Sequence, residues 1–201
     1  MLLRGLKIVF KSIVAILVRR IYKRFRIIKF DIFSTNKSFG GPLKKHQPVL
    51  LMGKGRIVFG RDVNVGVSTS PKFWSSEFYI EARSEASKIE VGSGTWFNNC
   101  VSVISHKDIV KIGELCLVGH DVLIVDSDFH CINPDLRHSG GPIDCGPVFI
   151  GNNVFIGSQV TILKKTIVGA GSVIAAGSVV SGQFPPNSLI AGNPARLIRT
   201  I

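Results

Sequence analysis

The fold of this chain is decided by residues 150–180, which read IGNNVF-IGSQVT-ILKKTI-VGAGSV-IAAGSV-V. An aliphatic residue opens every block of six, and these repeat positions are Ile150, Ile156, Ile162, Val168, Ile174 and Val180. A helix repeats about every 3.6 residues and a half-buried strand every second residue, so neither produces a constant spacing of six. The spacing indicates short strands joined by regular corners.

Small side chains mark those corners. Small or β-branched residues stand four places after five of the repeat positions: Val154, Val160, Thr166, Ser172 and Ser178. A narrow inward corner accepts only such residues, and glycine tolerates the backbone angles of a turn. Three faces of six residues make a coil of eighteen, the geometry of hexapeptide repeats. We therefore expect Ile150 to pack on Val168 and Ile156 on Ile174 in an aliphatic column that no single coil could bury alone.

The same spacing recurs upstream. It is found at Ile112, Val118 and Ile124, with fragments at Val91, Phe97, Val103, Phe59 and Val65. The sequence predicts an all-β protein, a parallel β-helix of hexapeptide repeats over about residues 55–181, in a domain of residues 55–201 with a short C-terminal extension. Residues 31–54 are expected to form a linker. A β-sandwich of short strands is the alternative, which the unbroken spacing disfavours.

The positive charge belongs to the N-terminal segment. The net charge is +12, and nine of the 25 basic residues lie in the first 30 positions, which hold no acidic residue. The remaining 171 residues hold 16 basic and 13 acidic side chains. This near balance gives no support to a nucleic-acid groove on the β-helix.

Residues 1–30 are predicted to form an amphipathic helix. Its apolar side is formed by Leu3, Leu6, Phe10, Ile13 and Leu17. The basic stripe beside it is formed by Arg4, Lys7 and Lys11. The longest apolar run has six residues, against about 20 in a spanning helix. We expect an in-plane helix on an anionic cytoplasmic leaflet, making the protein cytoplasmic and peripheral on the inner membrane. The alternative is that the apolar stripe packs on the β-helix or on a partner helix.

The four cysteines show no metal-binding pattern. Cys100, Cys116, Cys131 and Cys145 form no C-x-x-C pair, and no histidine stands at zinc-ligand spacing. Without a secretory signal, they are most simply reduced cytosolic thiols. We expect no metal cofactor.

The repeat breaks after Ile124, and a histidine stands at the break. Six residues after Ile124 comes His130, and the register returns only at Ile150, a gap of 20 residues where a coil takes 18. The residues between, 131–147, are rich in glycine, proline and asparagine and are predicted to form an extruded loop. Imidazole suits proton transfer from a hydroxyl at neutral pH. His130 is therefore a candidate catalytic residue, against the alternative of a structural histidine.

Several motifs resemble those of the galactoside and maltose O-acetyltransferase family, a branch of the left-handed β-helix acyltransferases. The resemblance covers about residues 90–201 and rests on Asp128-Phe129-His130, Asp135-Leu136-Arg137, the stretch from Ile150 to Ser158, Pro185-Pro186-Asn187, and Ala191-Gly192-Asn193-Pro194-Ala195-Arg196. It implies the left-handed twist, which periodicity cannot give. It also implies acetyl-CoA as co-substrate and a homotrimer with active sites between neighbouring prisms.

The resemblance also implies roles for single residues. His130 matches the general base, and Ser158 matches a residue whose backbone N–H stabilises the oxyanion. Acceptor contacts are implied for Asn98, Asp128 and Arg137. His106 is a further candidate, at a position where the family often carries an acidic residue. The pantetheine arm and nucleotide of CoA are implied to contact Phe155, Ser158, Ala176, Ser181, Arg196 and Arg199, the arginines suiting phosphate groups.

The sequence departs from the family in two places near the implied CoA groove. Phe155 stands where many members have tryptophan, which keeps an aromatic wall but loses an N–H donor. Leu163-Lys164-Lys165 replaces the usual Pro-Gly turn. The two lysines either meet phosphate or form a solvated turn, and the second interpretation is favoured.

The leading hypothesis is an acetyl-CoA-dependent O-acetyltransferase acting on a sugar hydroxyl. The basic helix suggests a saccharide acceptor that is lipid-linked, as in surface-polysaccharide synthesis. Alternatives are a serine or other small-molecule O-acetyltransferase, a zinc enzyme resembling γ-carbonic anhydrases, and a non-catalytic scaffold of hexapeptide repeats. The sequence does not identify the acceptor.

Overall fold

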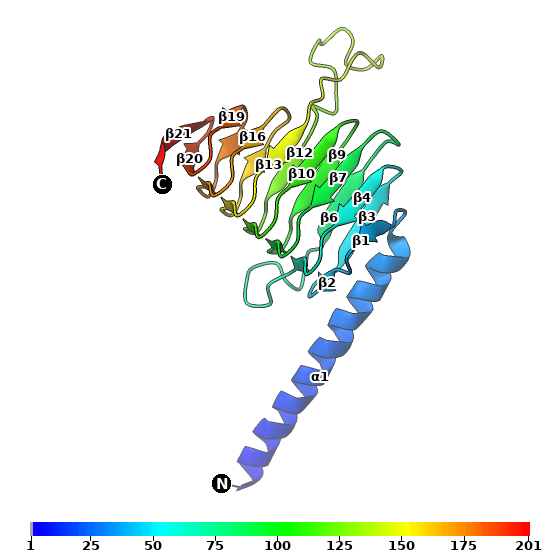
Figure 1. Ribbon diagram of the computed structural model, residues 1–201. Helices are drawn as coiled ribbons and strands as arrows, with labels where there is room; N and C mark the ends of the chain where they lie inside the picture. The colour runs from blue at the N-terminus through cyan, green and yellow to red at the C-terminus, as the bar shows by residue number, and fades with distance from the viewer. Residues whose placement is uncertain (1) are drawn as a thin grey trace.

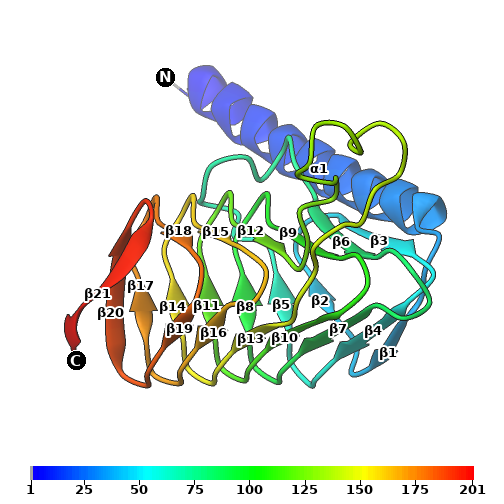
Figure 2. The same ribbon diagram turned by 90° about the horizontal axis from the view of Figure 1, so that it is seen from above.

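The computed structural model describes residues 2–201, with the side chains of residues 2–10 outside the described part. A long helix, α1 (Leu2–Phe33), precedes a three-sided prism of short strands (Figure 1). The chain passes through the three sides in a fixed order, which we call sheets A, B and C. Figure 2 shows the coils following one another along the prism. The prism is a parallel β-helix.

Each sheet takes one strand from successive coils, and β21 adds a further C-terminal strand to sheet B. Sheet A contains β1 (Ser38–Gly40), β4 (Arg56–Phe59), β7 (Lys88–Val91), β10 (Ile109–Ile112), β13 (Val148–Ile150), β16 (Ile167–Val168) and β19 (Gln183–Phe184). Sheet B contains β2 (Lys44–Lys45), β5 (Asn64–Val65), β8 (Trp96–Phe97), β11 (Leu117–Val118), β14 (Phe155–Ile156), β17 (Val173–Ile174), β20 (Ser188–Gly192) and β21 (Ala195–Thr200). Sheet C contains β3 (Val49–Gly53), β6 (Phe78–Ala82), β9 (Ser102–Ser105), β12 (Leu123–Val125), β15 (Thr161–Ile162) and β18 (Val179–Val180). We call the edges where one sheet gives way to the next the AB, BC and CA corners.

The predicted eighteen-residue register is confirmed. Ile150 pairs with Val168, and Ile156 pairs with Ile174. The strand pairs are parallel except for β20 and β21, which form an antiparallel C-terminal extension. The corners impose left-handed backbone angles every six residues, at Asn153, Gln159, Lys165, Gly171 and Gly177. Glycine adopts that conformation freely, whereas it costs other residues about 1–2 kcal/mol.

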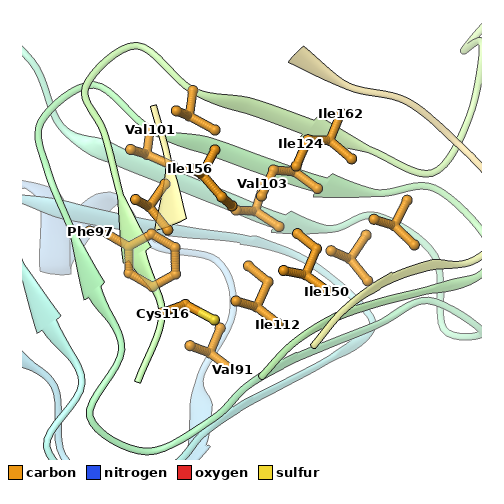
Figure 3. Packing of buried hydrophobic residues seen from close by; sticks show 14 of the residues in the cluster. Val91, Phe97, Val101, Val103, Ile112, Cys116, Ile124, Ile150, Ile156 and Ile162 are labelled. Carbon is orange, nitrogen blue, oxygen red and sulfur yellow. The ribbon is translucent and has the colours of Figure 1, made fainter. Parts of the chain in front are cut away.

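The repeat positions fill the interior of the prism. Figure 3 shows side chains from all three sheets converging on one column, with Phe97 among the aliphatic residues. Phe97 stacks on Phe78, with ring centroids 4.7 Å apart. The five predicted corner residues, from Val154 to Ser178, are all buried. Each coil therefore covers the apolar interior of its neighbour.

The strands begin before residue 55. Ser38 to Gly40 pair with β4, and Val49 to Gly53 pair with β6, so residues 38–53 extend the prism. These strands lie within residues 31–54, the segment expected to be a linker. They hold few of the repeat-spaced aliphatic residues that make later coils recognisable, and their backbone pairing with β4 and β6 defines them.

Helix α1 extends to Phe33, and its N-terminal part projects away from the prism (Figure 1). Ile13 and Leu17, from the predicted apolar stripe, are each 51% exposed. The stripe residues Leu3, Leu6 and Phe10 and the cations Arg4 and Lys7 lie outside the described side chains. Within the part of the chain that is described, no helix is both long and apolar enough to cross a membrane.

The C-terminal part of α1 is fixed to the prism through residues 66–77, a loop at the BC corner. The buried Arg26 guanidinium donates hydrogen bonds to the carbonyls of Phe73, at 3.0 Å, and Ser76, at 2.5 Å. Tyr22 packs against Trp74, with ring centroids 6.3 Å apart. Asp31 pairs with Lys45 at 2.6 Å. The loop thus holds the helix in one orientation.

Loop 66–77 is itself held by Asn99, which is fully buried at the BC corner. The Asn99 amide oxygen accepts a hydrogen bond from the Val67 N–H at 2.9 Å, and its amide nitrogen donates to the carbonyls of Val67, Ser70 and Pro71. Lys72 pairs with Asp121 at 2.5 Å on the next coil. These contacts use all the hydrogen-bonding groups of one side chain to order the loop.

Candidate functional site

The residues implied in function occupy two separate edges of the prism. His106, Asp128, His130 and Ser181 lie at the CA corner, and Arg137 lies in the loop that leaves it. Asn98, Phe155, Ser158 and Ala176 lie on sheet B or at the BC corner, and Arg196 and Arg199 lie on β21. Sheet C stands between the two edges. One chain therefore does not bring these residues together.

The extruded loop leaves the CA corner through a narrow neck, where Ser127 and Cys145 form an antiparallel bridge. The Gly146 N–H donates to the Asp126 carbonyl at 2.9 Å, and the Asp128 N–H donates to the Asp144 carbonyl at 3.2 Å. Phe129 has a positive φ of 62°. His130 follows immediately and is exposed, at the foot of a loop that stands clear of the prism (Figure 1).

Asp126 organises the backbone at this corner and is fully buried. Its carboxylate accepts hydrogen bonds from the N–H groups of His106, Lys107 and Asp108, at 2.6, 3.3 and 2.9 Å, and from the Ser105 hydroxyl at 2.9 Å. Four donors satisfy a charge that would otherwise be costly to bury. Asp126 thereby positions His106 in one coil and the start of the loop in the next.

Lys164 and Lys165 hold the neck of the loop. Lys164 pairs with Asp128 and, at 3.4 Å, with Asp144, while Lys165 pairs with Asp144 at 2.6 Å. Both lysines thus meet carboxylates at the foot of the loop, rather than forming a turn that only solvent contacts. The left-handed φ of 60° at Lys165 falls where the family usually has a Pro-Gly turn.

Two members of this cluster, Asp144 and Lys164, have pKa values shifted in the direction that favours their charged forms. The hydrogen bond from Lys165 lowers the pKa of Asp144 below its ordinary 3.8. Burial opposes the charge on Lys164, but its bonds to Asp128 and Asp144 raise its pKa above the ordinary 10.5. The stabilisation from Asp144 is lost only as pH falls below 3.8, and that from Lys164 only as pH rises above 10.5.

An aromatic and charged cluster adjoins the neck on the outer side of sheet C. The Arg83 guanidinium lies 4.9 Å from the Phe129 ring centre, and His106 meets the edge of the same ring at 6.4 Å. Glu81 accepts hydrogen bonds from Arg83 at 2.9 and 3.1 Å and from the Tyr79 hydroxyl at 3.0 Å. The bonds from Arg83 lower the pKa of Glu81, whereas burial raises the pKa of Tyr79.

Three buried polar atoms at the CA corner have no partner among the described residues. They are the Nδ1 atom of His106, the Oγ atom of Ser127 and the Oδ2 atom of Asp128. Buried polar atoms are normally hydrogen-bonded, so this corner, which also carries the exposed His130, has hydrogen-bonding capacity left for a water or a polar ligand. Arg137 does not share in this arrangement, because its guanidinium donates to the carbonyls of Cys131 and Ile132 inside the loop.

A hollow of about 390 Å³ lies on sheet B, between Asn98 and Phe155. Its other walls are mainly apolar and are formed by Val67, Trp96, Leu117, Val118 and Gly119. Asn98 donates a hydrogen bond to the Ser70 hydroxyl at 3.0 Å, and Phe155 is 49% exposed. An apolar hollow with one amide at its rim suits a slender, mostly apolar chain.

Ser158 lies in the BC corner close to this hollow. Its carbonyl accepts a hydrogen bond from the Gly177 N–H at 2.9 Å, and none of the described residues accepts one from its own N–H. The neighbouring corner residues His120 and Ala176 also have N–H groups without a described acceptor. The corner thus presents a row of free donors, of which Ser158 is one.

The remaining implied residues are exposed. Ser181 borders a second hollow, of about 380 Å³, together with Asp128, Lys164 and Lys165. Arg196 and Arg199 lie on the exposed strand β21, where each guanidinium contacts only a backbone carbonyl of its own strand among the described residues. Both guanidinium groups are therefore accessible to anions.

Sequence reasoning missed Asp126, Glu81 and Arg83. One feature of the sequence could have indicated Asp126: it directly follows the last regular strand before the repeat breaks. Glu81 lies on β6 and Arg83 directly follows the end of that strand, but nothing in the sequence connects them with Phe129, which Arg83 contacts.

All four cysteines are free thiols. Burial raises the pKa of Cys116 and of Cys145, which keeps both thiols protonated at neutral pH. Among the described residues, no three His, Cys, Asp or Glu side chains come together in a way that could hold a metal ion.

Comparisons with known proteins agree with this architecture. A family model described as bacterial transferase hexapeptide (six repeats) matches residues 147–182, the region of the clearest repeats. No match was found among curated proteins. The hexapeptide-repeat-containing acetyltransferase of Vibrio cholerae O1 biovar eltor, solved with acetyl coenzyme A, is 26% identical with a TM-score of 0.54, over 81% of this chain and 71% of that one.

Two further solved structures are similar to this chain. Galactoside acetyltransferase in complex with coenzyme A is 30% identical with a TM-score of 0.53, over 69% of this chain and 64% of that one. This chain thus spans less than two thirds of the galactoside enzyme. The polySia-specific acetyltransferase NeuO is 27% identical with a TM-score of 0.53, over 81% of this chain and 68% of that one.

These matches confirm the predicted left-handed β-helix of hexapeptide repeats. They also confirm the resemblance to hexapeptide-repeat acetyltransferases, and they support the prediction of an acyltransferase.

Replacing Lys164 by methionine should loosen the loop, because Asp128 and Asp144 lose a shared cation that is itself only 18% exposed. We expect trypsin to cut after Arg137, inside the loop, about fivefold faster than in the unsubstituted protein. Lys111→Met removes an exposed lysine from sheet A and is the matched control. Equal cleavage rates in the two variants would show that the lysine does not hold the neck.

Proposed function

We propose that this chain is an acetyl-CoA-dependent O-acetyltransferase whose acceptor is a saccharide hydroxyl. The observation that carries the proposal is the position of His130, exposed at the foot of the extruded loop, at the same corner as the unpartnered polar atoms of His106 and Asp128. The similar solved structures are acetyltransferases, one described with acetyl coenzyme A and another with coenzyme A. One is described as specific for polySia, which favours a saccharide acceptor here.

The chemistry proposed for the site uses His130 as a general base. The imidazole takes the proton from the acceptor hydroxyl while the hydroxyl oxygen attacks the thioester carbonyl of acetyl-CoA. The resulting oxyanion is stabilised by the free N–H of Ser158. When the tetrahedral intermediate collapses, the carbon–sulfur bond breaks and the imidazolium returns its proton to the leaving thiolate. The products are the acetyl ester and CoA.

We assign the two co-substrates to the two edges of the prism. Acetyl-CoA would lie along sheet B, with its pantetheine arm in the hollow beside Phe155 and along Ser158 and Ala176. The exposed guanidinium groups of Arg196 and Arg199 suit its nucleotide and phosphates, and Ser181 would reach them from the CA corner of a neighbouring copy. The acceptor would contact His106 and Asp128 at the CA corner and Asn98 at the sheet B hollow of the neighbour, and Arg137 would shape the loop above it.

This division of the site requires a second copy of the chain. His130 and the sheet B hollow lie on opposite sides of sheet C, so neither edge contains a complete site. A ring of identical prisms in head-to-tail contact places the CA corner of one copy beside sheet B of the next. We therefore propose a homotrimer, the assembly that the resemblance implies, with one site at each interface.

Replacing His130 by alanine should lower kcat for acetyl transfer about 10²- to 10⁴-fold, because the hydroxyl loses its base. The KM for acetyl-CoA should stay the same, since the CoA contacts lie on sheet B. Steady-state kinetics with a panel of free and lipid-linked glycans measures both quantities. His138→Ala, in the exposed part of the same loop, is the control. Unchanged kcat in His130→Ala would remove this residue as the base, and no turnover or acetyl-CoA binding in the unsubstituted protein would favour a scaffold.

A subunit-mixing experiment tests the shared site. His130→Ala and Phe155→Asp, the second of which places a charge in the apolar hollow, should each be nearly inactive alone. Trimers co-expressed from equal amounts of both variants should regain about a quarter of full activity. An interface is active only when its CA corner comes from a Phe155→Asp copy and its sheet B from a His130→Ala copy, which chance gives at about one interface in four. Mixed trimers as inactive as their parents would place both edges in one chain's site.

We further propose that α1 holds the enzyme on the cytoplasmic face of the inner membrane, where a lipid-linked acceptor would be found. The helix exposes Ile21, Phe25 and Ile28, with Arg20 and Arg24 beside them. Its one acidic side chain among those described, Asp31, is paired with Lys45. An exposed apolar face with unpaired cations suits an anionic lipid surface.

Removing residues 1–20 should weaken flotation with vesicles that contain phosphatidylglycerol, because it removes part of the apolar face and several cations, while keeping Arg26 and the contact with loop 66–77. The full chain should float, and rising salt should reduce its binding because the cations are exposed. Acetyl transfer to a free glycan serves as the control for folding and should not change. A shortened protein that floats as well as the full chain would show that residues 1–20 do not contribute to membrane binding.

A further inference from the structure

Loop 66–77 lies between α1 and the sheet B hollow and contacts both. Arg26 of the helix donates to the carbonyls of Phe73 and Ser76, at one side of the loop. At the other side, Val67 lines the hollow and the Ser70 hydroxyl accepts a hydrogen bond from Asn98. Asn99 fixes the backbone between them. The orientation of the helix on a surface therefore determines which way the sheet B hollow faces relative to that surface.

Part of the exposed apolar surface of α1 forms an arc that is directed away from the Arg26 contact. At about 100° per residue, Leu17, Ile21 and Ile28 lie about 140–180° round the helix from Arg26. They are 51%, 69% and 51% exposed. An apolar face turned away from its own protein is available to an external partner.

Cations lie along both borders of this arc, and one border also carries aromatic rings. Arg20 and Arg24 lie along the first border, in the same shallow hollow as Ile21 and Phe25. Lys29 and then Tyr22 lie beyond Phe25 on the other border, and the Tyr22 ring meets Trp74 of loop 66–77. Trp74 is 40% exposed although it is among the largest apolar side chains of the loop. Flanking cations and a Tyr–Trp pair are the composition favoured at a lipid interface.

We propose that Trp74 continues the apolar arc of α1, and that helix and loop together form one surface that binds an anionic lipid bilayer. This inference rests on the membrane association proposed above and adds the orientation of the prism. Because Trp74 lies only four residues after Ser70, the loop residue that Asn98 contacts, the rim of the sheet B hollow lies close to the headgroups. The acceptor that fits such a site is a saccharide attached to a lipid of the same membrane.

A second copy of the chain suits this surface less well. Helices that associate through an apolar stripe usually place opposite charges along its borders. The described side chains of α1 include one acidic residue, Asp31, which already pairs with Lys45. They also include seven basic residues: Lys11, Arg19, Arg20, Lys23, Arg24, Arg26 and Lys29. Self-association would bring these cations together without carboxylates to balance them.

Tryptophan fluorescence tests the orientation, because the chain has two tryptophans. Trp96→Phe leaves Trp74 as the sole reporter, and Trp74→Phe leaves Trp96, in the hollow, as the matched control. On vesicles of phosphatidylcholine and phosphatidylglycerol, we expect the emission of Trp74 to shift to the blue and to be quenched by brominated lipid. Trp96 should respond to neither. Trp74→Ser should weaken binding about tenfold, as loss of a partly buried aromatic side chain does.

The outcomes separate this inference from the proposal on which it rests. If the Trp96→Phe protein sediments with vesicles while Trp74 emission stays as in buffer, the orientation is wrong and membrane binding stands. If it does not sediment with anionic vesicles, membrane binding itself is wrong. A blue shift without lipid that grows with protein concentration would identify a second copy as the occupant of the surface and would overturn the inference.

Discussion

The structure depends on the stacking of each aliphatic residue on the one a coil later in the chain. Because parallel strands are about 4.8 Å apart, one branched aliphatic side chain per face and coil fills the interior. Ile150 on Val168 and Ile156 on Ile174 show the spacing that results. Corners must then be narrow, which requires small or β-branched residues inside and left-handed angles outside. The interior has no room for polar chemistry, so every candidate functional group lies on a corner, a loop or an outer face.

The same regularity explains what the sequence could predict. The strands from Ile112 onward follow from the six-residue spacing, because periodic packing leaves a periodic pattern. The strands from Ser38 to Gly53 leave no such pattern, since they cap the prism and are defined by backbone pairing with β4 and β6. The position of His130 was predictable because the six-residue spacing stops there. The point where a regular spacing is interrupted can be located in a sequence as readily as the spacing itself.

The contacts that hold the irregular segments could not be predicted in the same way. Arg26 reaches carbonyls about fifty residues away, and nothing near it in sequence distinguishes it from the other cations of the helix. Asp126 takes four donors from a turn in the preceding coil. Lys164 and Lys165 depart from the turn that the resemblance implies, and only the structure identifies their partners, Asp128 and Asp144, at the neck of the loop. Each is a long-range polar contact, specific to this chain and independent of the repeat.

A rigid prism also restricts how the proposed activity can be organised. The two edges with candidate functional residues cannot approach one another within a chain, because sheet C holds them apart through its hydrogen bonds and the packed core. Adjustment is therefore confined to the two excursions, residues 66–77 and residues 131–147, and charged or amide side chains of the prism fix the base of each one. Asn99 and Asp121 hold the first, and Lys164 and Lys165 hold the second. Under the proposed function, the first excursion would set how the site faces the membrane, and the second would set where the catalytic histidine stands.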